Sequence, residues 1–257
     1  MKIKTYVINL KDSADRREAV LAETSKYPFM EVELVEAVDG RKLKPEEFKD
    51  RFDLKKFIDR YYRTPKGGEI GCTLSHRICY RKLLESNEKF ALILEDDVCF
   101  IYPEDIENTL NDILNEYKDD KPYFITLALH FLYYPKKYRK LGNYAFYRLY
   151  EANGTCAYLI NRRAAAHLLS VSVPFTVADD FYFMRGRGIL TEGIYPTFAV
   201  GASTKDTIPT EIQRESIVYK KLTLSQYILF EYKRICCEIL LKWGRLSWRS
   251  YIRGINE

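Results

Sequence analysis

The chain alternates between short apolar runs and longer stretches in which apolar residues recur at helical spacing. Short apolar or alternating runs are typical of strands in a sheet. Such runs occur at residues 4–10, 31–37, 90–94, 123–129, 156–160 and 194–200. Helical spacing covers residues 14–27, 69–86, 106–117 and 163–170, and another helix is expected to begin at Phe181. Because strands alternate with helices, the pattern predicts an α/β fold with a mostly parallel sheet flanked by helices.

Two segments fit this alternation less well. Residues 41–68 are highly charged and predict one short helix at the sequence KPEEF, followed by a loop around Pro65 and Gly68. Residues 130–152 are rich in tyrosine, and no element is predicted for them. The pair Asp39 and Gly40 is a turn signal that separates the second strand from the charged segment.

The net charge of +5 comes from the C-terminal end of the chain. Residues 220–257 contain eight basic and three acidic residues, whereas residues 1–219 contain 33 of each sign. The main body is therefore not broadly basic, which disfavours a nucleic-acid-binding surface. We predict a main domain at residues 1–215 and a basic, amphipathic helical segment at residues 216–257.

Both tryptophans of the chain lie in this C-terminal segment, among many aliphatic residues. This composition suits a helix that lies on an anionic membrane surface. The alternative is a basic helix whose apolar side docks on the main domain. No signal peptide or spanning stretch is recognised, and the six cysteines contain no CxxC pair. We therefore expect a cytoplasmic protein, either free or bound peripherally to the inner face of the cytoplasmic membrane.

Three acidic residues, Glu95, Asp96 and Asp97, follow directly on the apolar run at residues 90–94. In open parallel sheets, ligands bind outside the carboxyl ends of the strands. Carboxylates gathered there repel one another unless a cation or hydrogen-bond donors compensate them, and hard divalent cations take carboxylate oxygens. On an extended strand Glu95 and Asp97 face one side and Asp96 the other. The pattern predicts one metal between Glu95 and Asp97; the alternative is a solvated acidic turn or a helix cap.

Four short motifs then occur in order along the chain. The sequence VINL at residues 7–10 is followed by two arginines, and GCTLSH at residues 71–76 is followed by LEDD at residues 94–97. GTCAY at residues 154–158 precedes a pair of alanines, and VADDF occupies residues 177–181. Together, across residues 3–205, these motifs resemble glycosyltransferase family 25, which contains bacterial lipooligosaccharide galactosyltransferases and collagen galactosyltransferases.

The resemblance implies a GT-A-like, Rossmann-type catalytic domain at residues 1–215, a UDP-sugar donor, Mn²⁺ or Mg²⁺, and inversion at the anomeric carbon. A divalent cation between carboxylates and a diphosphate neutralises the charge that develops on the leaving group. By resemblance, Asp97 is the first candidate for a direct metal ligand and Glu95 is the second. Asp96 is assigned to the ribose or to the surroundings of the metal.

An inverting transfer also needs a carboxylate on the acceptor side, which takes the proton of the attacking hydroxyl. By resemblance, Asp179 matches the acidic residue of the family motif and is the first candidate, with Asp180 as the alternative. An Asp often caps the helix that follows it. One of the pair is therefore expected to cap the helix that begins at Phe181.

The first motif contributes three candidate donor-site residues. By resemblance, Asn9, Arg16 and Arg17 reach the uracil, ribose or diphosphate of the donor. The planar guanidinium group suits phosphate. The alternative for the two arginines is a solvated helix face paired with nearby acidic residues.

The GCTLSH motif contributes the remaining candidates. Gly71 is expected to let the backbone approach the ligand or the helix closely. Ser75 and His76 are assigned to the donor site by resemblance, although a lone His inside a helix is more often a packed side chain. Cys72 and Cys156 are interpreted as small packed residues.

The predicted function is transfer of a hexose, galactose by resemblance, from a UDP-sugar to a lipooligosaccharide or related glycan. One alternative is a Mg²⁺-dependent phosphotransferase or nucleotidyltransferase, although the glycine-rich loop usual in such sites is missing. Another is an inactive, membrane-associated sugar-binding protein. One departure concerns the metal: many GT-A enzymes use a late His ligand, and nothing after His167 supplies one. Residues 201–204 (GAST) offer only hydroxyls there.

Overall fold

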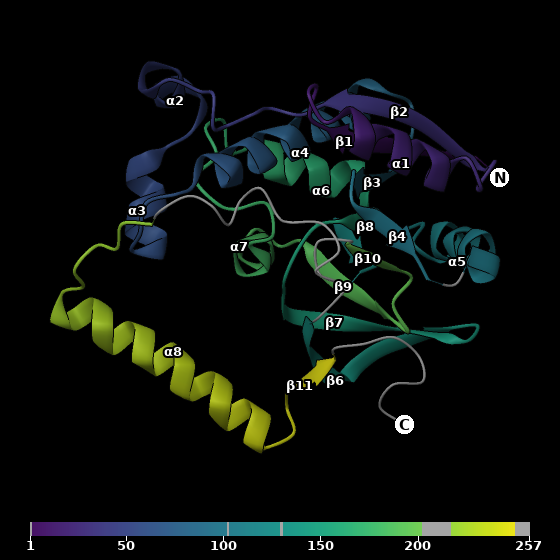
Figure 1. Cartoon of the computed structure of the whole chain (residues 1–257). Coiled ribbons are helices and arrows are strands. Elements are labelled where there is room, and N and C mark those ends of the chain that lie inside the picture. Colours follow the sequence, from purple (N-terminus) through teal and green to yellow (C-terminus); the bar gives the residue numbers. More distant parts are fainter. Residues whose placement is uncertain (1, 102, 129–130, 202–216, 250–257) are drawn as a thin grey trace.

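The computed structural model describes residues 2–101, 103–128, 131–201 and 217–249. Within these ranges, nine strands form one sheet through the centre of the molecule (Figure 1). In spatial order they are β11 (Ser247–Arg249), β6 (Phe131–Leu141), β7 (Tyr144–Ala152), β9 (Leu190–Tyr195), β5 (Tyr123–Thr126), β8 (Ala157–Asn161), β3 (Phe90–Glu95), β1 (Ile3–Asn9) and β2 (Met30–Glu36).

The sheet is mixed. β2, β1 and β3 run parallel at one end, and β5 runs parallel to β9. β8 lies antiparallel between β3 and β5, and the other end is extended by antiparallel pairs among β9, β7, β6 and β11. The expected α/β fold with a mixed sheet flanked by helices is confirmed. Antiparallel pairing is more extensive than the sequence pattern indicated, because residues 130–152 form the β6–β7 hairpin.

Helices cover both faces of the sheet. α1 (Ala14–Thr24) and α5 (Pro103–Glu116) pack in the apolar cluster on one face, and α4 (Gly67–Glu85), α6 (Arg162–Leu169) and α7 (Phe181–Gly186) pack in the cluster on the other. The side chains of β3 alternate between the two clusters. This is the period of two that a strand buried on both faces requires. Ala91 and Ile93 point to the α4 face of the sheet, and Glu95 is the next side chain of β3 on that face.

Besides the β6–β7 hairpin, further elements were not predicted from the sequence. Residues 41–68 contain α2 (Pro45–Arg51), as expected, and also α3 (Leu54–Tyr61), for which no element was predicted. Phe57 of α3 is fully buried in a small cluster with Ile70 and Leu74 of α4, so tertiary packing forms this helix in a strongly charged segment. β4 (Val98–Phe100) pairs antiparallel with β10 (Ala199–Gly201) just beyond the acidic residues.

The C-terminal segment contains the helix α8 (Leu224–Lys242) and also β11. Its two flanks are attached to the main domain. The backbone N–H of Lys220 donates to the carbonyl of Tyr62 after α3 (2.8 Å), and β11 pairs with β6 beside the buried Leu246. α8 itself has no buried residue, so its apolar side is not docked on the main domain. No helix in the described ranges is long and apolar enough to span a bilayer.

Candidate functional site

A cavity of about 190 Å³ opens at the carboxyl ends of the parallel strands β1 and β3. The pairing register places Ile8 opposite Glu95, so both strands end at the same edge of the sheet. Its walls come from the end of β1, the loop after β2, the first turns of α4 and the acidic turn after β3. The predicted site residues that line it are Arg16, Ser75, His76, Glu95, Asp96 and Asp97.

The shape of the cavity depends on a backbone contact between α4 and the loop after β2. A Cβ atom on Gly71 would lie 2.3 Å from the carbonyl oxygen of Val38, so only glycine fits without displacing the loop. Ser75 reinforces this contact, because its hydroxyl donates to the carbonyl of Gly71 (2.7 Å) and accepts from the N–H of Val38 (2.8 Å). The hydroxyl of Ser75 thus fixes the cavity wall, and Gly71 allows the close approach expected of it.

Asp96 is held by donors from β1 and α1. Asn9 Nδ2 donates to its Oδ2 (2.7 Å), and the guanidinium of Arg16 forms an ion pair with its Oδ1. Arg17 points elsewhere: its Nη1 donates to Asn9 Oδ1 (3.2 Å) and to the carbonyl of Lys11 (3.1 Å). Arg16 therefore lies at the cavity, whereas Arg17 orients Asn9 from behind it.

The acidic residues do not alternate as expected. β3 ends at Glu95, and Asp96 and Asp97 form a turn, so the two-sided pattern of an extended strand does not continue past Glu95. All three nevertheless line the same cavity, and Asp97 is only 7% exposed. The alternative of a solvated acidic turn does not describe Asp97, because this side chain is buried at the cavity wall.

Glu95 lies in a network with His76 and the GTCAY segment. His76 is buried; its Nε2 lies 3.3 Å from Glu95 Oε1, and its Nδ1 lies 2.7 Å from the hydroxyl of Tyr158. Thr155 Oγ1 donates to the same Glu95 oxygen (2.7 Å). Burial by itself raises the pKa of Glu95, but the hydrogen bonds and charge from His76, together with Thr155, leave that pKa below its ordinary value. Glu95 is therefore held as a carboxylate.

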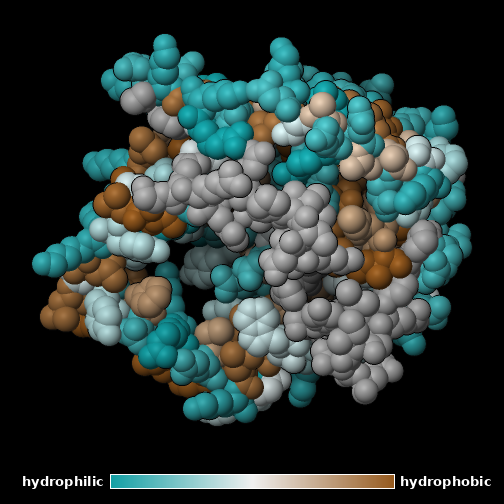
Figure 2. All heavy atoms as spheres, viewed as in Figure 1, coloured by the Kyte–Doolittle hydropathy of each residue, from teal (hydrophilic) through white to brown (hydrophobic). Residues whose placement is uncertain are grey.

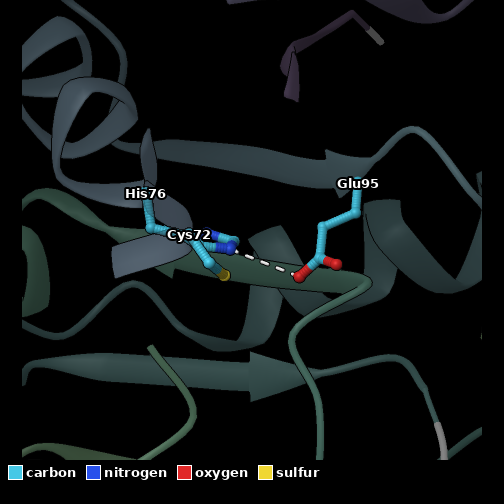
Figure 3. A group of neighbouring side chains, drawn as sticks. All are labelled: Cys72, His76 and Glu95. Atoms are coloured by element: carbon cyan, nitrogen blue, oxygen red, sulfur yellow. Dashed lines mark hydrogen bonds and ion pairs between the residues drawn. The ribbon is translucent and has the colours of Figure 1, made fainter. Parts of the chain in front are cut away.

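Cys72, His76 and Glu95 converge on one point (Figure 3). The first two come from successive turns of α4 and the third from the end of β3, and their potential ligand atoms all lie within 4.8 Å of one another. Burial, reinforced by the charges of Glu95 and Asp179, raises the pKa of the Cys72 thiol well above its ordinary value. A protonated thiol is a poor ligand for Mn²⁺ or Mg²⁺, which take oxygen. Carboxylates that could supply oxygen to such an ion line this cavity, and the predicted ligands Glu95 and Asp97 are among them.

The adjacent residues Asp179 and Asp180 have different surroundings. Asp180 caps α7 by accepting from Phe183 N (2.7 Å), and it accepts two hydrogen bonds from Arg60 (2.5 and 2.9 Å) and one from the hydroxyl of Tyr61. Its oxygens are fully engaged, which confirms the expected cap and argues against Asp180 as a base.

Asp179 makes few contacts by comparison. Its Oδ2 accepts from the backbone N–H of Gly154 (2.9 Å). Burial, with the nearby charges of Glu95 and Asp180, raises its pKa above the ordinary value despite this hydrogen bond. A carboxylate with a raised pKa is a stronger proton acceptor, which is the property that a general base needs.

Several residues at the site were not singled out from the sequence as functional. Thr155 and Tyr158 hold Glu95 and His76, and the GTCAY motif that contains them was the available signal. Asp39 and Arg41 line the cavity from the loop after β2. Their only sequence signal was the turn at Asp39 and Gly40. The late GAST segment continues into residues 202–204, which lie outside the described residues.

The fold and the cavity define an α/β protein with a ligand site at the carboxyl ends of its parallel strands. The chain belongs to glycosyltransferase family 25: the family model, described as "Glycosyltransferase family 25 (LPS biosynthesis protein)", matches residues 2–183. This confirms the family predicted from the four motifs.

Similar proteins are known from animals. Procollagen galactosyltransferase 2 from Homo sapiens is 38% identical over 98 residues, and a glycosyltransferase 25 family member from Aedes aegypti is 36% identical over 99 residues. Each match covers 37% of this chain and only 16% of the relative. The chain therefore corresponds to a small part of these longer proteins.

Two solved structures show a remote likeness. GlyE, a glycosyltransferase from Streptococcus pneumoniae, has a TM-score of 0.36 at 10% identity, with 98% of this chain and 66% of that chain covered. A197 from STIV has a TM-score of 0.38 at 13% identity, with 87% and 96% covered.

Proposed function

We propose that this chain is an inverting galactosyltransferase that uses UDP-galactose and extends a lipooligosaccharide or a related glycan. The observation that carries the proposal is that two sets of carboxylates lie close together in different surroundings: those of the acid-lined cavity and that of Asp179. A buried, acid-lined cavity suits a nucleotide diphosphate with its cation, and beside it the Asp179 carboxylate accepts from the backbone N–H of Gly154 and has a raised pKa. Galactose, UDP and the glycan class are suggested by the family and by the galactosyltransferases among the relatives.

The cavity residues divide into two proposed roles toward the donor. Arg16, which reaches the cavity from α1, offers its guanidinium to the diphosphate, and the Asn9–Asp96 pair is positioned for the ribose. Glu95 and Asp97 would hold Mn²⁺ or Mg²⁺ through carboxylate oxygens. When bound, such an ion offsets the negative charge that grows on the departing UDP.

The proposed reaction is a single displacement. The acceptor hydroxyl oxygen forms a bond to the anomeric carbon while the bond from that carbon to the β-phosphate oxygen breaks, and UDP leaves with the electron pair. Asp179 takes the hydroxyl proton during this step. The raised pKa of Asp179 supports this role, and the saturated contacts of Asp180 leave it as the positioning residue that fixes the start of α7.

We further propose that α8 attaches the protein to the membrane that carries its glycolipid acceptor. Large apolar side chains remain exposed on this helix, among them Ile228, Ile235, Ile239 and Trp243. The basic composition of the C-terminal segment supports binding to an anionic leaflet, although Arg234 is paired with Glu231 and Glu238 within the helix. The apolar surface is thus expected to supply most of the binding.

The test is release of UDP from UDP-galactose in the presence of Mn²⁺, measured with and without a glycan acceptor and compared with UDP-glucose and UDP-N-acetylhexosamines. We expect metal-dependent release that increases with acceptor. Asp97→Ala should abolish metal-dependent donor binding, since it removes a buried oxygen ligand. The absence of UDP binding and release across the donor panel would exclude the transferase proposal, and metal-dependent binding retained in Asp97→Ala would move the ion to other ligands.

A further inference from the structure

A groove of about 510 Å³ lies between α8 and the main domain. Its walls come from α3, β7, α7 and α8, and it shares no lining residue with the cavity at β1 and β3. Figure 2 shows the surface hollowed beside α8. The helix is anchored at both flanks and has no fully buried residue, so it forms a side wall over the groove and not part of the core.

The groove presents aromatic rings together with charged groups, and the most exposed region is around Tyr182. Tyr182 of α7 is 55% exposed. Three cationic groups lie over this ring: Lys233 Nζ of α8 is 5.3 Å from its centroid, the guanidinium of Arg185 is 5.4 Å away and that of Arg60 is 5.8 Å away. A sugar ring that packs its apolar C–H face on Tyr182 would take the place of one of these cations, and its rim of hydroxyls would bond to the polar groups around the ring.

Most charged groups of the groove already have partners. Lys56 pairs with Asp53, Arg60 with Asp180, and Asp59 with Lys220. In the described ranges, Lys233 and Glu151 form no ion pair within 4 Å. Their ammonium and carboxyl groups face the groove and are available to donate to, or accept from, the hydroxyls of a ligand.

The groove leads to the proposed base. Asp180 lines it, and Asp179 is the preceding residue. On the other side, the Asp179 carboxylate accepts from the backbone N–H of Gly154, whose neighbour Thr155 donates to Glu95 in the donor cavity. The chain thus brings Asp179 next to residues of both sites, where the base of a transfer between two bound sugars has to be.

We propose that this groove is the acceptor subsite, in which a sugar ring of the acceptor stacks on Tyr182 while its hydroxyls bond to Lys233 and Glu151. This inference rests on the proposed function and adds the place where the acceptor binds. In this proposal α8 also contributes to acceptor binding, because Lys233 belongs to this helix. The donor cavity is then built from the parallel end of the sheet, and the acceptor subsite from α3, α7 and α8.

The test compares Tyr182→Ala and Lys233→Ala with the wild-type chain, using de-O-acylated lipooligosaccharide as a water-soluble acceptor. Binding of this saccharide is measured by titration without donor, and transfer is measured with UDP-galactose. Each substitution should weaken saccharide binding and raise the acceptor KM by about tenfold. The donor KM and the release of UDP to water should not change, and Tyr182→Phe should retain binding because the ring remains.

Matched controls come from α8 itself. Tyr227 is 52% exposed and does not line the groove, and Lys242 is an exposed lysine near the end of the same helix. Tyr227→Ala and Lys242→Ala should leave saccharide binding unchanged. Equal binding by the wild type and the two groove variants, or no binding by the wild type, overturns the subsite. Failure of the wild type to use UDP-galactose contradicts the donor proposal alone, because saccharide binding is measured without donor.

Discussion

The donor cavity and the groove under α8 are built in contrasting ways. The cavity is enclosed by backbone contacts and buried hydrogen bonds: Gly71 touches the loop after β2, and His76, Thr155 and Glu95 hold one another. The groove is lined by half-exposed side chains, and its outer wall is a helix without a single buried residue. A rigid cavity suits a ligand of constant shape, such as a nucleotide, whereas an open groove can change with the acceptor at little cost in stability.

The two neighbouring aspartates lie where these regions meet and repeat the contrast on a smaller scale. Asp180 is fixed by Arg60, Tyr61 and the first turn of α7, whereas Asp179 accepts from the backbone N–H of Gly154. We propose on this basis that Asp180 serves stability and that Asp179 serves proton transfer. A pair of substitutions can separate these roles.

The largest expected effect is on catalysis. Asp179→Asn keeps the hydrogen bond from Gly154 but cannot take a proton, so transfer should fall by about 10²–10⁴-fold while donor binding is unchanged. In the wild type, the rate should fall as the pH drops through the raised pKa of Asp179, because only the ionised form acts as a base. The measurement is a pH–rate profile of transfer, with donor binding followed separately.

The stability of this variant distinguishes a base from a structural residue. A carboxyl whose pKa is raised in the folded state stabilises the fold when it is protonated, and this contribution is lost as the pH rises through that pKa. Asp179→Asn should therefore melt at the same temperature as the wild type, or higher, at neutral pH. Asp180→Asn, which breaks the ion pair with Arg60, should melt lower. Full turnover by Asp179→Asn would move the base to another residue.

The sequence predicted the donor region better than the groove. Continuous apolar runs located β1 and β3, and strand topology alone was enough to bring Glu95, Asp96 and Asp97 to one edge of the sheet. The network around Glu95 depends on residues about 20 and 60 positions away, His76 and Thr155, whose pairing no local pattern encodes. Only the family motifs marked them.

The groove depends on packing that periodicity does not describe. α3 forms in a charged segment because Phe57 enters a small apolar cluster, and α8 remains exposed although its sequence would suit docking. Tyr182 and Lys233 meet only because α8 is attached at both flanks. The sequence predicted α8 from its basic and apolar composition, and this composition does not tell which side of the helix faces the main domain.

A smaller effect is expected where the rigidity of the donor cavity is tested. Gly71→Ala places a methyl group 2.3 Å from the carbonyl oxygen of Val38, so the loop after β2 has to move. We expect a loss of about 1–3 kcal/mol in the free energy of unfolding, together with weaker donor binding. Saccharide binding in the groove should persist. Chemical denaturation and donor titration measure the first two effects.

The matched control is Gly186→Ala at the end of α7, where an added Cβ meets nothing within 4 Å. This substitution should leave both stability and donor binding close to those of the wild type. If Gly71→Ala behaved like Gly186→Ala, the backbone contact would not determine the shape of the cavity, and the contrast between a rigid donor site and an open groove would lose its main support.

The smallest expected effect concerns the outer side of α8. Ile235 and Ile239 are 45% and 39% exposed, so replacing both with Ser should leave the melting temperature unchanged. The apolar area removed should lower binding to vesicles of phosphatidylethanolamine and phosphatidylglycerol by about tenfold or more. Lys242→Ala should weaken binding less, and its effect should vanish at high salt. Transfer to the water-soluble acceptor should be unaffected, because Lys233 and Tyr182 remain in place.

A double Ser variant that binds vesicles as well as the wild type would contradict membrane attachment through α8. A double Ser variant that loses transfer to the water-soluble acceptor would show that the two sides of the helix are not independent.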